Sequence, residues 1–394
     1  MGTLRTLDDV SPAGRRVLLR LDLNVPIDGG RVTGSERIAR SLATVHELAD
    51  TGARTIIIAH LGRPGGRPDP SMSLAPVAEA VADALGRPVA FATDTIGDNA
   101  ADIIASTRPG DVVVLENLRF HPGEEADDRD FARALGALGD IYVNDAFSVS
   151  HRAHASVTSL ARLLPSCAGR LMEEEVNAIA RALSHPVRPI AAVVGGAKVS
   201  TKLAILDHLS HWADHLVVGG AMANTFLAAQ GTGIGASLHE GDMTGTAVRI
   251  MKSARARGRA IHLPVDVVVE KDGQPVSCDL DAIGLEARIL DIGPLTVRSV
   301  SRLIEGCRTV VWNGPMGMFE REGFDRGTVD LARTIADLTR SGSIFSVAGG
   351  GDTAAALTRA GATDGFSYVS TAGGAFLQWL EGTPLPGLVA LEAA

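Results

Sequence analysis

Apolar runs rich in β-branched residues alternate with amphipathic stretches rich in Ala and Leu over the first part of the chain. The apolar runs predict short strands, and the amphipathic stretches predict helices. The expected strands cover 16–21, 54–59, 111–115 and 140–143, and the expected helices between them cover 35–49, 74–85 and 128–138. Strands that alternate with helices in this way are typical of a parallel sheet with helices on both faces.

The alternation pauses around residues 160–189, and this pause indicates a boundary between two domains. Residues 170–183 predict one amphipathic helix, which Pro186 and Pro189 close. The glutamates at 173–175 lie near its start, where negative charge complements the helix dipole, so they need no ligand. We interpret this helix as the connector between the domains.

The alternation then restarts, which predicts a second α/β domain. Its expected strands cover 189–194, 215–218, 260–263, 309–312, a run from 344, and 368–370. A chain of 394 residues is also too long for one ordinary core. The expected fold is therefore bilobal and α/β, with two Rossmann-like domains that each hold a parallel sheet. The expected boundaries are 1–169, the connector 170–184 and 185–375, followed by a tail over 376–394 that must dock on one of the domains.

Basic and polar residues directly follow the strands of the first domain. Ligands of such sheets bind beyond the carboxyl ends of the strands, so these residues indicate a site. The basic side chains expected on this rim are Arg37, His60, Arg63, Arg119 and Arg152. A single arginine is more often a solvated surface residue. Repeated placement after strands instead favours a small ligand that carries carboxylate or phosphate groups.

The strand ends of the second domain are rich in glycine. Residues 344–353 predict a strand, a glycine turn at 349–351 and the start of a helix. Glycines let the backbone come close to an anion, and the amides of the first helical turn point at it. Asp352 adds a hard oxygen ligand that suits Mg²⁺. We expect a phosphate-rich nucleotide with its metal here, and a turn that uses glycine only for its backbone freedom is the alternative.

Lysine is rare, because the 37 basic residues include only Lys198, Lys202, Lys252 and Lys271. The first two stand one helical turn apart in a glycine-led segment, which suggests a specific need for a compact ammonium group. Both could face the phosphates of a nucleotide. The glycines that could offer backbone amides to the same phosphates are Gly350, Gly351 and Gly373.

Composition excludes several other classes of protein. The net charge of −9 leaves no excess positive field for nucleic acid. Neither a long apolar run nor a secretion signal is found, so we expect no membrane span and no export. Three scattered cysteines argue against a disulfide framework and fit a reducing cytoplasm. His151 and His154 lack companions at metal-binding spacing, so loop packing or anion contact is favoured over a metal site.

Phosphoryl transfer suits this combination of sites better than the alternatives. The sequence contains neither a P-loop nor the motifs of a protein kinase. Gly349, Gly351 and Ala354 resemble a dinucleotide fingerprint of dehydrogenases, but residues 369–371 offer no acid where one should bind the ribose. Phosphoryl transfer requires mainly positioning and charge compensation. No general base is evident, and none is needed if the acceptor or leaving group is a carboxylate.

These motifs closely resemble those of the phosphoglycerate kinase family over essentially the whole chain. The matching segments are 20–26, 60–64, 116–120, 144–147 with 151–154, 195–202, 312–320, 346–353 and 370–374. The resemblance implies reversible phosphoryl transfer from 1,3-bisphosphoglycerate to Mg-ADP, which gives 3-phosphoglycerate and Mg-ATP in glycolysis and gluconeogenesis. It also implies a monomer whose tail returns to the first domain. Because the two sites lie on separate domains, we expect hinge closure.

The resemblance further implies roles for individual residues. Those expected to hold the glycerate ligand are Asp22, Asn24, Arg37, His60, Arg63, Arg119 and Arg152. Those expected to serve the nucleotide are Lys198, Lys202, Asn313, Pro315, Glu320, Gly350, Gly351, Asp352 and Thr353. Within that set Glu320 would bind the ribose hydroxyls and Asp352 the Mg²⁺ ion. The expected catalytic residues are Arg37, Lys198 and Gly373.

Two short segments depart from the family pattern. Residues 148–150 read Ser-Val-Ser where the family commonly has Gly-Thr-Ala, and residues 372–374 read Ala-Gly-Gly where it commonly has three glycines. Neither change removes a charged site residue. The alternative function is therefore a specialised second copy or a catalytically weak nucleotide-binding paralogue with a regulatory role.

Overall fold

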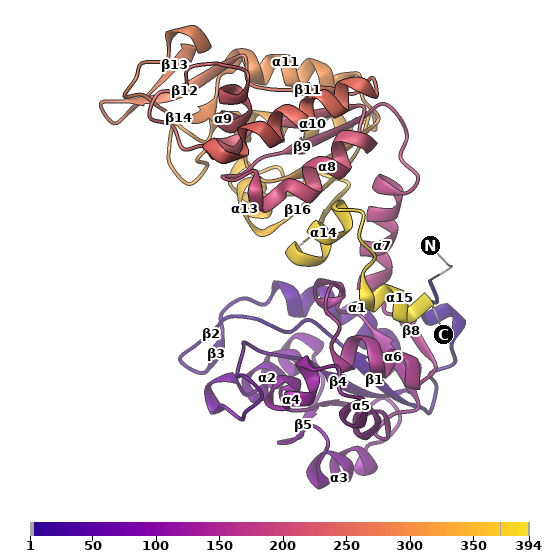
Figure 1. Ribbon diagram of the computed structural model, residues 1–394. Coiled ribbons are helices and arrows are strands. Elements are labelled where there is room, and N and C mark those ends of the chain that lie inside the picture. Colours follow the sequence, from indigo (N-terminus) through magenta and orange to yellow (C-terminus); the bar gives the residue numbers. More distant parts are fainter. Residues whose placement is uncertain (1–3, 371, 393–394) are drawn as a thin grey trace. The chain divides into compact units, whose positions relative to one another are not determined.

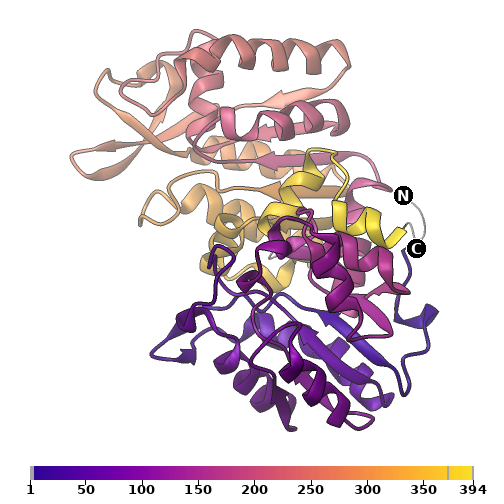
Figure 2. The same ribbon diagram turned by 60° about the horizontal axis from the view of Figure 1, so that its bottom comes forward.

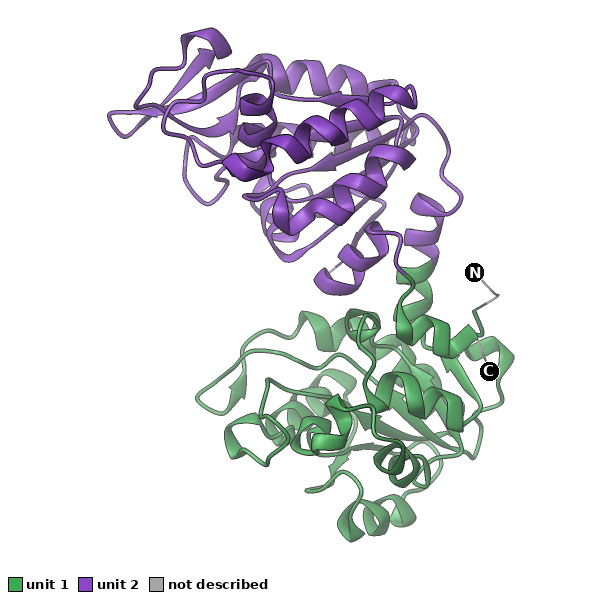
Figure 3. Cartoon of the chain, in the orientation of Figure 1, with its two compact units in different colours: residues 1–176, 384–394 green, residues 177–383 purple. Residues whose placement is uncertain are grey.

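The structure is a computed structural model that describes residues 4–370 and 372–392 (Figures 1 and 2). It divides into two compact units. Unit 1 contains the chain up to Val176 together with the stretch from Pro384, and unit 2 is Asn177–Thr383 (Figure 3). Each unit is built around a six-stranded sheet whose strands all run parallel. The expectation of an α/β fold with two parallel sheets is confirmed.

The sheet of unit 1 has the strand order β5-β6-β4-β1-β7-β8. Its strands are β1 (Arg16–Arg20), β4 (Arg54–Ile58), β5 (Val89–Phe91), β6 (Val112–Val114), β7 (Ile141–Asn144) and β8 (Ser166–Ala168). A small hairpin pairs β2 (Ile27–Asp28) with β3 (Arg31–Val32). The helices are α1 (Glu36–Asp50), α2 (Ala75–Leu85), α3 (Asp98–Ser106), α4 (Pro122–Glu125), α5 (Arg129–Gly136) and α6 (Leu160–Leu163).

Burial on both faces explains why the central strands are almost wholly apolar. Val17 and Leu19 of β1 share a core cluster with Val45 and Leu48 of α1, all of them essentially inaccessible to water. Leu18 points to the other face of β1 and is equally buried. The two edge strands, β5 and β8, were not predicted. β5 is only partly buried, and β8 has the sequence Ser-Cys-Ala, which contains no β-branched residue.

The sheet of unit 2 has the strand order β11-β10-β9-β15-β16-β17. Its strands are β9 (Ile190–Val194), β10 (His215–Val218), β11 (Ala260–His262), β15 (Thr309–Asn313), β16 (Phe345–Gly349) and β17 (Tyr368–Ser370). The helices are α8 (Leu203–Trp212), α9 (Gly220–Ala229), α10 (Thr244–Ala256), α11 (Pro294–Glu305), α12 (Arg326–Arg340), α13 (Gly351–Ala360) and α14 (Gly373–Leu380). An antiparallel sheet that the sequence pattern did not predict contains β12 (Asp266–Lys271), β13 (Gln274–Asp279) and β14 (Arg288–Ile292).

The helix α7 (Arg170–Leu183) has the bounds expected for the connector. The division between the units falls inside it, after Val176, rather than at its ends. The chain returns to unit 1 at Pro384, later than the expected start of the tail at 376, because α14 packs on α8 of unit 2. The last helix, α15 (Pro386–Glu392), packs in unit 1 against α6.

None of the helices in the described part of the chain has the length and apolarity that a bilayer span requires.

Candidate active sites

The loops that follow β1 and β4 meet at the rim of unit 1, because these two strands are neighbours in the sheet. Arg37 Nη1 donates to Asp22 Oδ2 at 2.6 Å, and the Asn24 amide donates to Asp22 Oδ1 at 3.2 Å. The Gly62 amide then donates to Asn24 Oδ1 at 3.0 Å. The structure thus brings Asp22, Asn24 and Arg37 together.

Arg119 is the most informative cation of this rim. Its side chain is 3% exposed, and its Nη1 donates to Gly62 O at 2.7 Å. Its Nε lies 3.2 Å from Glu125 Oε1, but its buried Nη2 has no hydrogen-bond acceptor within the described residues. Burial lowers the pKa of Arg119, although the charge of Glu125 opposes that change. A buried donor without an acceptor is unfavourable, so this guanidinium is ready to bind an anion.

His60 and Arg152 complete the cationic group. His60 is 4% exposed, and burial together with the charges of Arg20, Arg119 and Arg152 lowers its pKa well below the ordinary value. Arg152 is half-buried, and its Nε lies 3.3 Å from His151 Nε2. These neighbours make His60 a neutral side chain among cations.

Arg63 differs from the other expected residues of this rim. It lies on the exposed part of the turn after β4, next to Gly62. Across the described ranges its side chain has no hydrogen bond or ion pair.

The rim of unit 2 contains a topological switch point between β9 and β15. From β9 the chain proceeds to β10 on one side, and from β15 it proceeds to β16 on the other. Ligands of open α/β sheets bind at such a point. A Cβ on Gly195 would lie 1.9 Å from Pro315 O, so only glycine lets the two loops approach this closely.

Lys202 and Asn313 meet at this switch point. Lys202 Nζ donates to Asn313 Oδ1 and to Gly195 O, both at 2.6 Å, and Asn313 Nδ2 donates to Gly349 O at 2.7 Å. Burial lowers the pKa of Lys202 to about 8, while the charge of Asp352 opposes this shift. The ammonium group is therefore held by oxygen acceptors beside the glycine turn.

The glycine turn itself leads from β16 into α13. Gly350 has φ +102°, a conformation that favours glycine, and Gly351 is the first residue of the helix. Thr353 Oγ1 accepts from the Gly314 amide at 2.7 Å, while Asp352 projects from the first turn and is exposed. The geometry supports an anion at this helix start, with a carboxylate beside it.

Comparisons with known proteins point to one family over nearly the whole chain. The family profile described as Phosphoglycerate kinase matches residues 7–383. The chain is 54% identical to the phosphoglycerate kinase of Methylorubrum extorquens strain PA1 over 398 residues, which covers 100% of both proteins. The chain belongs to the phosphoglycerate kinase family. It is a kinase, as the sequence motifs predicted.

Solved structures of phosphoglycerate kinases have the same fold. The structure from Coxiella burnetii matches with a TM-score of 0.91 and 40% identity, covering 99% of this chain and 98% of the other. The structure from Pyrococcus horikoshii OT3 matches with a TM-score of 0.83 and 32% identity, with the same coverage.

The remaining expected nucleotide residues of this phosphoglycerate kinase fold are more open. Lys198 and Glu320 are exposed, and Pro315 is half-buried beside Gly195. Gly373 is the first residue of α14, after β17. The contacts of these residues within unit 2 do not test their expected roles, which stay predictions.

Two residues near the unit 1 rim were missed by the sequence reasoning. Arg20 is fully buried at the end of β1, with Nη2 3.1 Å from His60 Nδ1. Ser148 Oγ donates to Asp22 Oδ2 at 2.5 Å, at a position where the resemblance led us to expect glycine. The departure from the expected pattern was the available signal for Ser148. Arg20 begins the matching segment 20–26, but it was given no role in the site.

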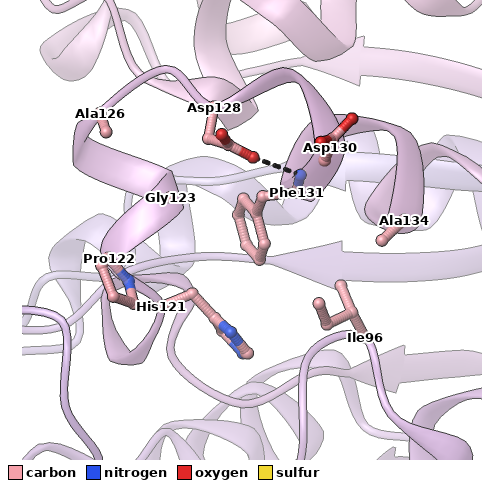
Figure 4. A pocket seen from close by; sticks show the side chains of 9 residues that line it. All are labelled: Ile96, His121, Pro122, Gly123, Ala126, Asp128, Asp130, Phe131 and Ala134. Atoms are coloured by element: carbon pink, nitrogen blue, oxygen red, sulfur yellow. Dashed lines mark hydrogen bonds between the residues drawn. The ribbon is translucent and has the colours of Figure 1, made fainter.

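A hollow of about 520 Å³ in unit 1 is distinct from these sites (Figure 4). The rings of His121 and Phe131 stack there with centroids 5.0 Å apart. Burial lowers the pKa of His121, and the charged residues lining this hollow are Asp128 and Asp130. A hollow with carboxylates and no cation does not suit an anionic substrate.

Proposed function

We propose that the chain catalyses reversible transfer of a phosphoryl group from 1,3-bisphosphoglycerate to Mg-ADP, giving 3-phosphoglycerate and Mg-ATP. The reaction is a step of glycolysis and, in reverse, of gluconeogenesis. The main support for the proposal, in a chain of this family, is the buried guanidinium of Arg119. Its Nη2 has no hydrogen-bond acceptor among the described residues. An anionic ligand would satisfy that donor.

The rim of unit 1 would hold the glycerate ligand. The side chain of Arg37 is 39% exposed, so it can turn from Asp22 to the reacting carboxylate of the ligand. Its positive charge would there compensate the negative charge of that carboxylate. Arg119 would position the ligand through its free donor. The other residues proposed to contact the ligand are Asn24, His60, Arg63 and Arg152.

The switch point of unit 2 would hold the nucleotide. Lys202 already lies among acceptors there, so phosphate oxygens would replace Asn313 and Gly195 as its partners. The other residues proposed to bind the nucleotide are Pro315, Glu320, Gly350, Gly351 and Thr353. The ammonium group of Lys198 and the backbone amide of Gly373 would contact the transferred phosphoryl group. They would stabilise the negative charge that develops on it during transfer.

Mg²⁺ would bind at Asp352. This carboxylate is exposed in the first turn of α13, and one carboxylate with substrate phosphates is a usual ligand set for this ion. Across the described residues, no three His, Cys, Asp or Glu side chains gather closely enough to hold a metal by themselves. The bound ion would neutralise phosphate charge.

We further propose that the chain acts as a cytoplasmic monomer without nucleic-acid partners. Unit 1 would be the glycerate-binding domain, completed by the C-terminal tail, and unit 2 the nucleotide-binding domain. The hinge would include α7, because the division between the units lies within it. No general base is required, since the acceptor in the reverse reaction is a carboxylate.

A coupled assay for ATP formation from 1,3-bisphosphoglycerate and Mg-ADP tests the proposal. Rapid ATP formation that depends on 1,3-bisphosphoglycerate would support it. Nucleotide binding without turnover would instead support the alternative, a catalytically weak nucleotide-binding paralogue, which no observation favours at present.

A further inference from the structure

We infer that Arg20 is a positioning residue that fixes the tautomer of His60, so that this histidine presents an Nε2–H donor to the glycerate ligand. The inference rests on the proposed function, because His60 is assigned to that ligand. It adds a residue outside the expected ligand set and gives the direction of one hydrogen bond.

The first step is the contact between the two side chains. Arg20 is 1% exposed, and its Nη2 lies 3.1 Å from His60 Nδ1. A guanidinium has donors only and keeps its charge in proteins, so Nδ1 must be the acceptor. A neutral imidazole that accepts at Nδ1 carries its proton at Nε2.

The second step is the fixed position of Arg20. Its Nε donates to Ser156 Oγ at 3.0 Å, and its Nη1 donates to Leu21 O. Ser156 Oγ in turn donates to Glu124 Oε1 at 2.6 Å, and the Ser156 amide donates to Glu124 Oε2 at 3.0 Å. The guanidinium therefore has no freedom to turn away from His60.

The third step is the charge balance of this buried network. Burial alone would raise the pKa of Glu124, but His154, Arg20 and Ser156 together hold it below the ordinary value. Glu124 is thus the buried anion that compensates Arg20. The largest charge effects on His60 come from Arg20, Arg119, Arg152 and His154, and each of them disfavours a second proton on the ring.

The consequence concerns ligand binding. His60 contributes a directed neutral donor, while the arginines contribute the positive charge. The orientation of this donor is set before the ligand binds. Binding therefore requires less ordering of the site than it would with a histidine that is free to change its tautomer.

Histidine-labelled full-length protein gives the direct test. Long-range ¹H–¹⁵N correlation spectra, with His60→Gln for assignment, should show a protonated Nε2 and a bare Nδ1 over about pH 5.5 to 8. A proton on Nδ1, or a doubly protonated ring in this range, would overturn the inference. This measurement needs no substrate, so an inactive protein with the expected tautomer would refute the proposed function alone.

A variant pair gives the functional test. Arg20→Met with Glu124→Gln removes both buried charges and the donor to Nδ1, whereas Glu124→Gln alone keeps that donor. The double variant should lose the tautomer preference and raise KM for 3-phosphoglycerate about tenfold, the worth of one hydrogen bond, with kcat and KM for nucleotide nearly unchanged. A double variant that folds and keeps both the tautomer and KM would contradict the role of Arg20.

A substitution of His60 itself separates the two ring nitrogens. The amide nitrogen of glutamine can take the place of Nε2, and that of asparagine the place of Nδ1. His60→Gln should therefore retain a lower KM for 3-phosphoglycerate than His60→Asn. The reverse order would show that the ligand binds at Nδ1.

Discussion

Arg37 is the side chain whose loss should affect the transfer step most directly, because it is the partly exposed cation beside Asp22. Arg37→Ala should lower kcat on the order of 10²-fold, as for other donors that stabilise developing charge. Arg119→Ala should instead raise KM for 3-phosphoglycerate, because its buried donor is proposed to position the ligand. Steady-state kinetics of both variants would check this, with the exposed Arg31→Ala as a control. A normal kcat for Arg37→Ala would remove it from the catalytic role.

The lysines of unit 2 allow a second test at the scale of single residues. Lys198→Arg and Lys202→Arg keep the charge but replace a compact ammonium with a wide planar fork, so both should impair turnover. The reason is clearest at Lys202, whose Nζ fits between Asn313 Oδ1 and Gly195 O at 2.6 Å from each. Lys252→Arg, on the exposed side of α10, is the matched control. Full activity of both site variants would refute a specific need for lysine.

The same lysine gives a pH dependence. The pKa of Lys202 is lowered to about 8, so its charge is complete below that value and is lost as the pH rises through it. Because phosphate binding needs the charged form, KM for ADP should rise between about pH 7.5 and 9. The pH profile of KM for ADP, measured beside that for 3-phosphoglycerate, checks this. A flat profile for ADP would show that Lys202 stays charged throughout.

At the scale of elements, the start of α7 depends on a buried carboxylate. Asp145 Oδ1 accepts from the Met172 amide at 2.8 Å, and a Cβ on Gly169 would lie 2.4 Å from the Asp145 carboxyl carbon. Burial raises the pKa of Asp145 to about 6, although the amides of Met172 and Leu171 oppose the shift. The ionised form is therefore disfavoured in the folded protein relative to the unfolded chain.

The sign of the resulting pH effect follows from linkage. A folded pKa above the unfolded value gives stability that is present at low pH and lost as the pH rises from about 4 to about 6. Asp145→Asn should gain stability relative to the native protein over this range, by no more than about 3 kcal/mol. Urea unfolding of both proteins at about pH 4.5 and pH 7.5 checks the change.

Asp140→Asn is the control. Its hydrogen bond with Arg16 lowers the pKa of Asp140, so the stability that this carboxylate adds is already present above about pH 4 and is lost only as the pH falls through the lowered pKa. Asp140→Asn should therefore differ from the native protein by nearly the same amount at both pH values, and a gain that grows with pH as in Asp145→Asn would show that the effect does not belong to Asp145.

At the scale of the whole molecule, the two proposed sites lie on different compact units. In-line transfer requires reacting atoms about 3 to 3.5 Å apart, so we predict that the units come together when both ligands are bound. Small-angle scattering should give a smaller radius of gyration with 3-phosphoglycerate and Mg-nucleotide together than with either alone. In Arg119→Ala, a higher concentration of 3-phosphoglycerate should be needed for the same decrease in the radius of gyration. Identical curves in all ligand states, from an active preparation, would exclude closure.

Local pattern was enough to predict much of the fold. The period of apolar residues gave the bounds of α7, and the buried β-branched runs gave β1, β9, β10 and their neighbours. It failed for the edge strands β5 and β8 and for the antiparallel sheet that β12 to β14 form. The Asp272-Gly273 turn between β12 and β13 was a local signal that the sequence reasoning missed, whereas β14 pairs with β12 from farther along the chain. The glycine turn before α13 was visible because a positive φ restricts the residue type.

The sequence by itself determined the residue types at the strand ends, and a parallel sheet requires these ends to share one edge. Only the tertiary structure decided which of them meet. Strand order placed Lys202 beside Asn313, and helix packing left Nη2 of Arg119 buried without a described acceptor. The role of Arg20 could not be predicted for the same reason. The sequence placed it at a strand end in the matching segment 20–26, but its role depends on contacts with His60 and Ser156, which lie far away in the chain.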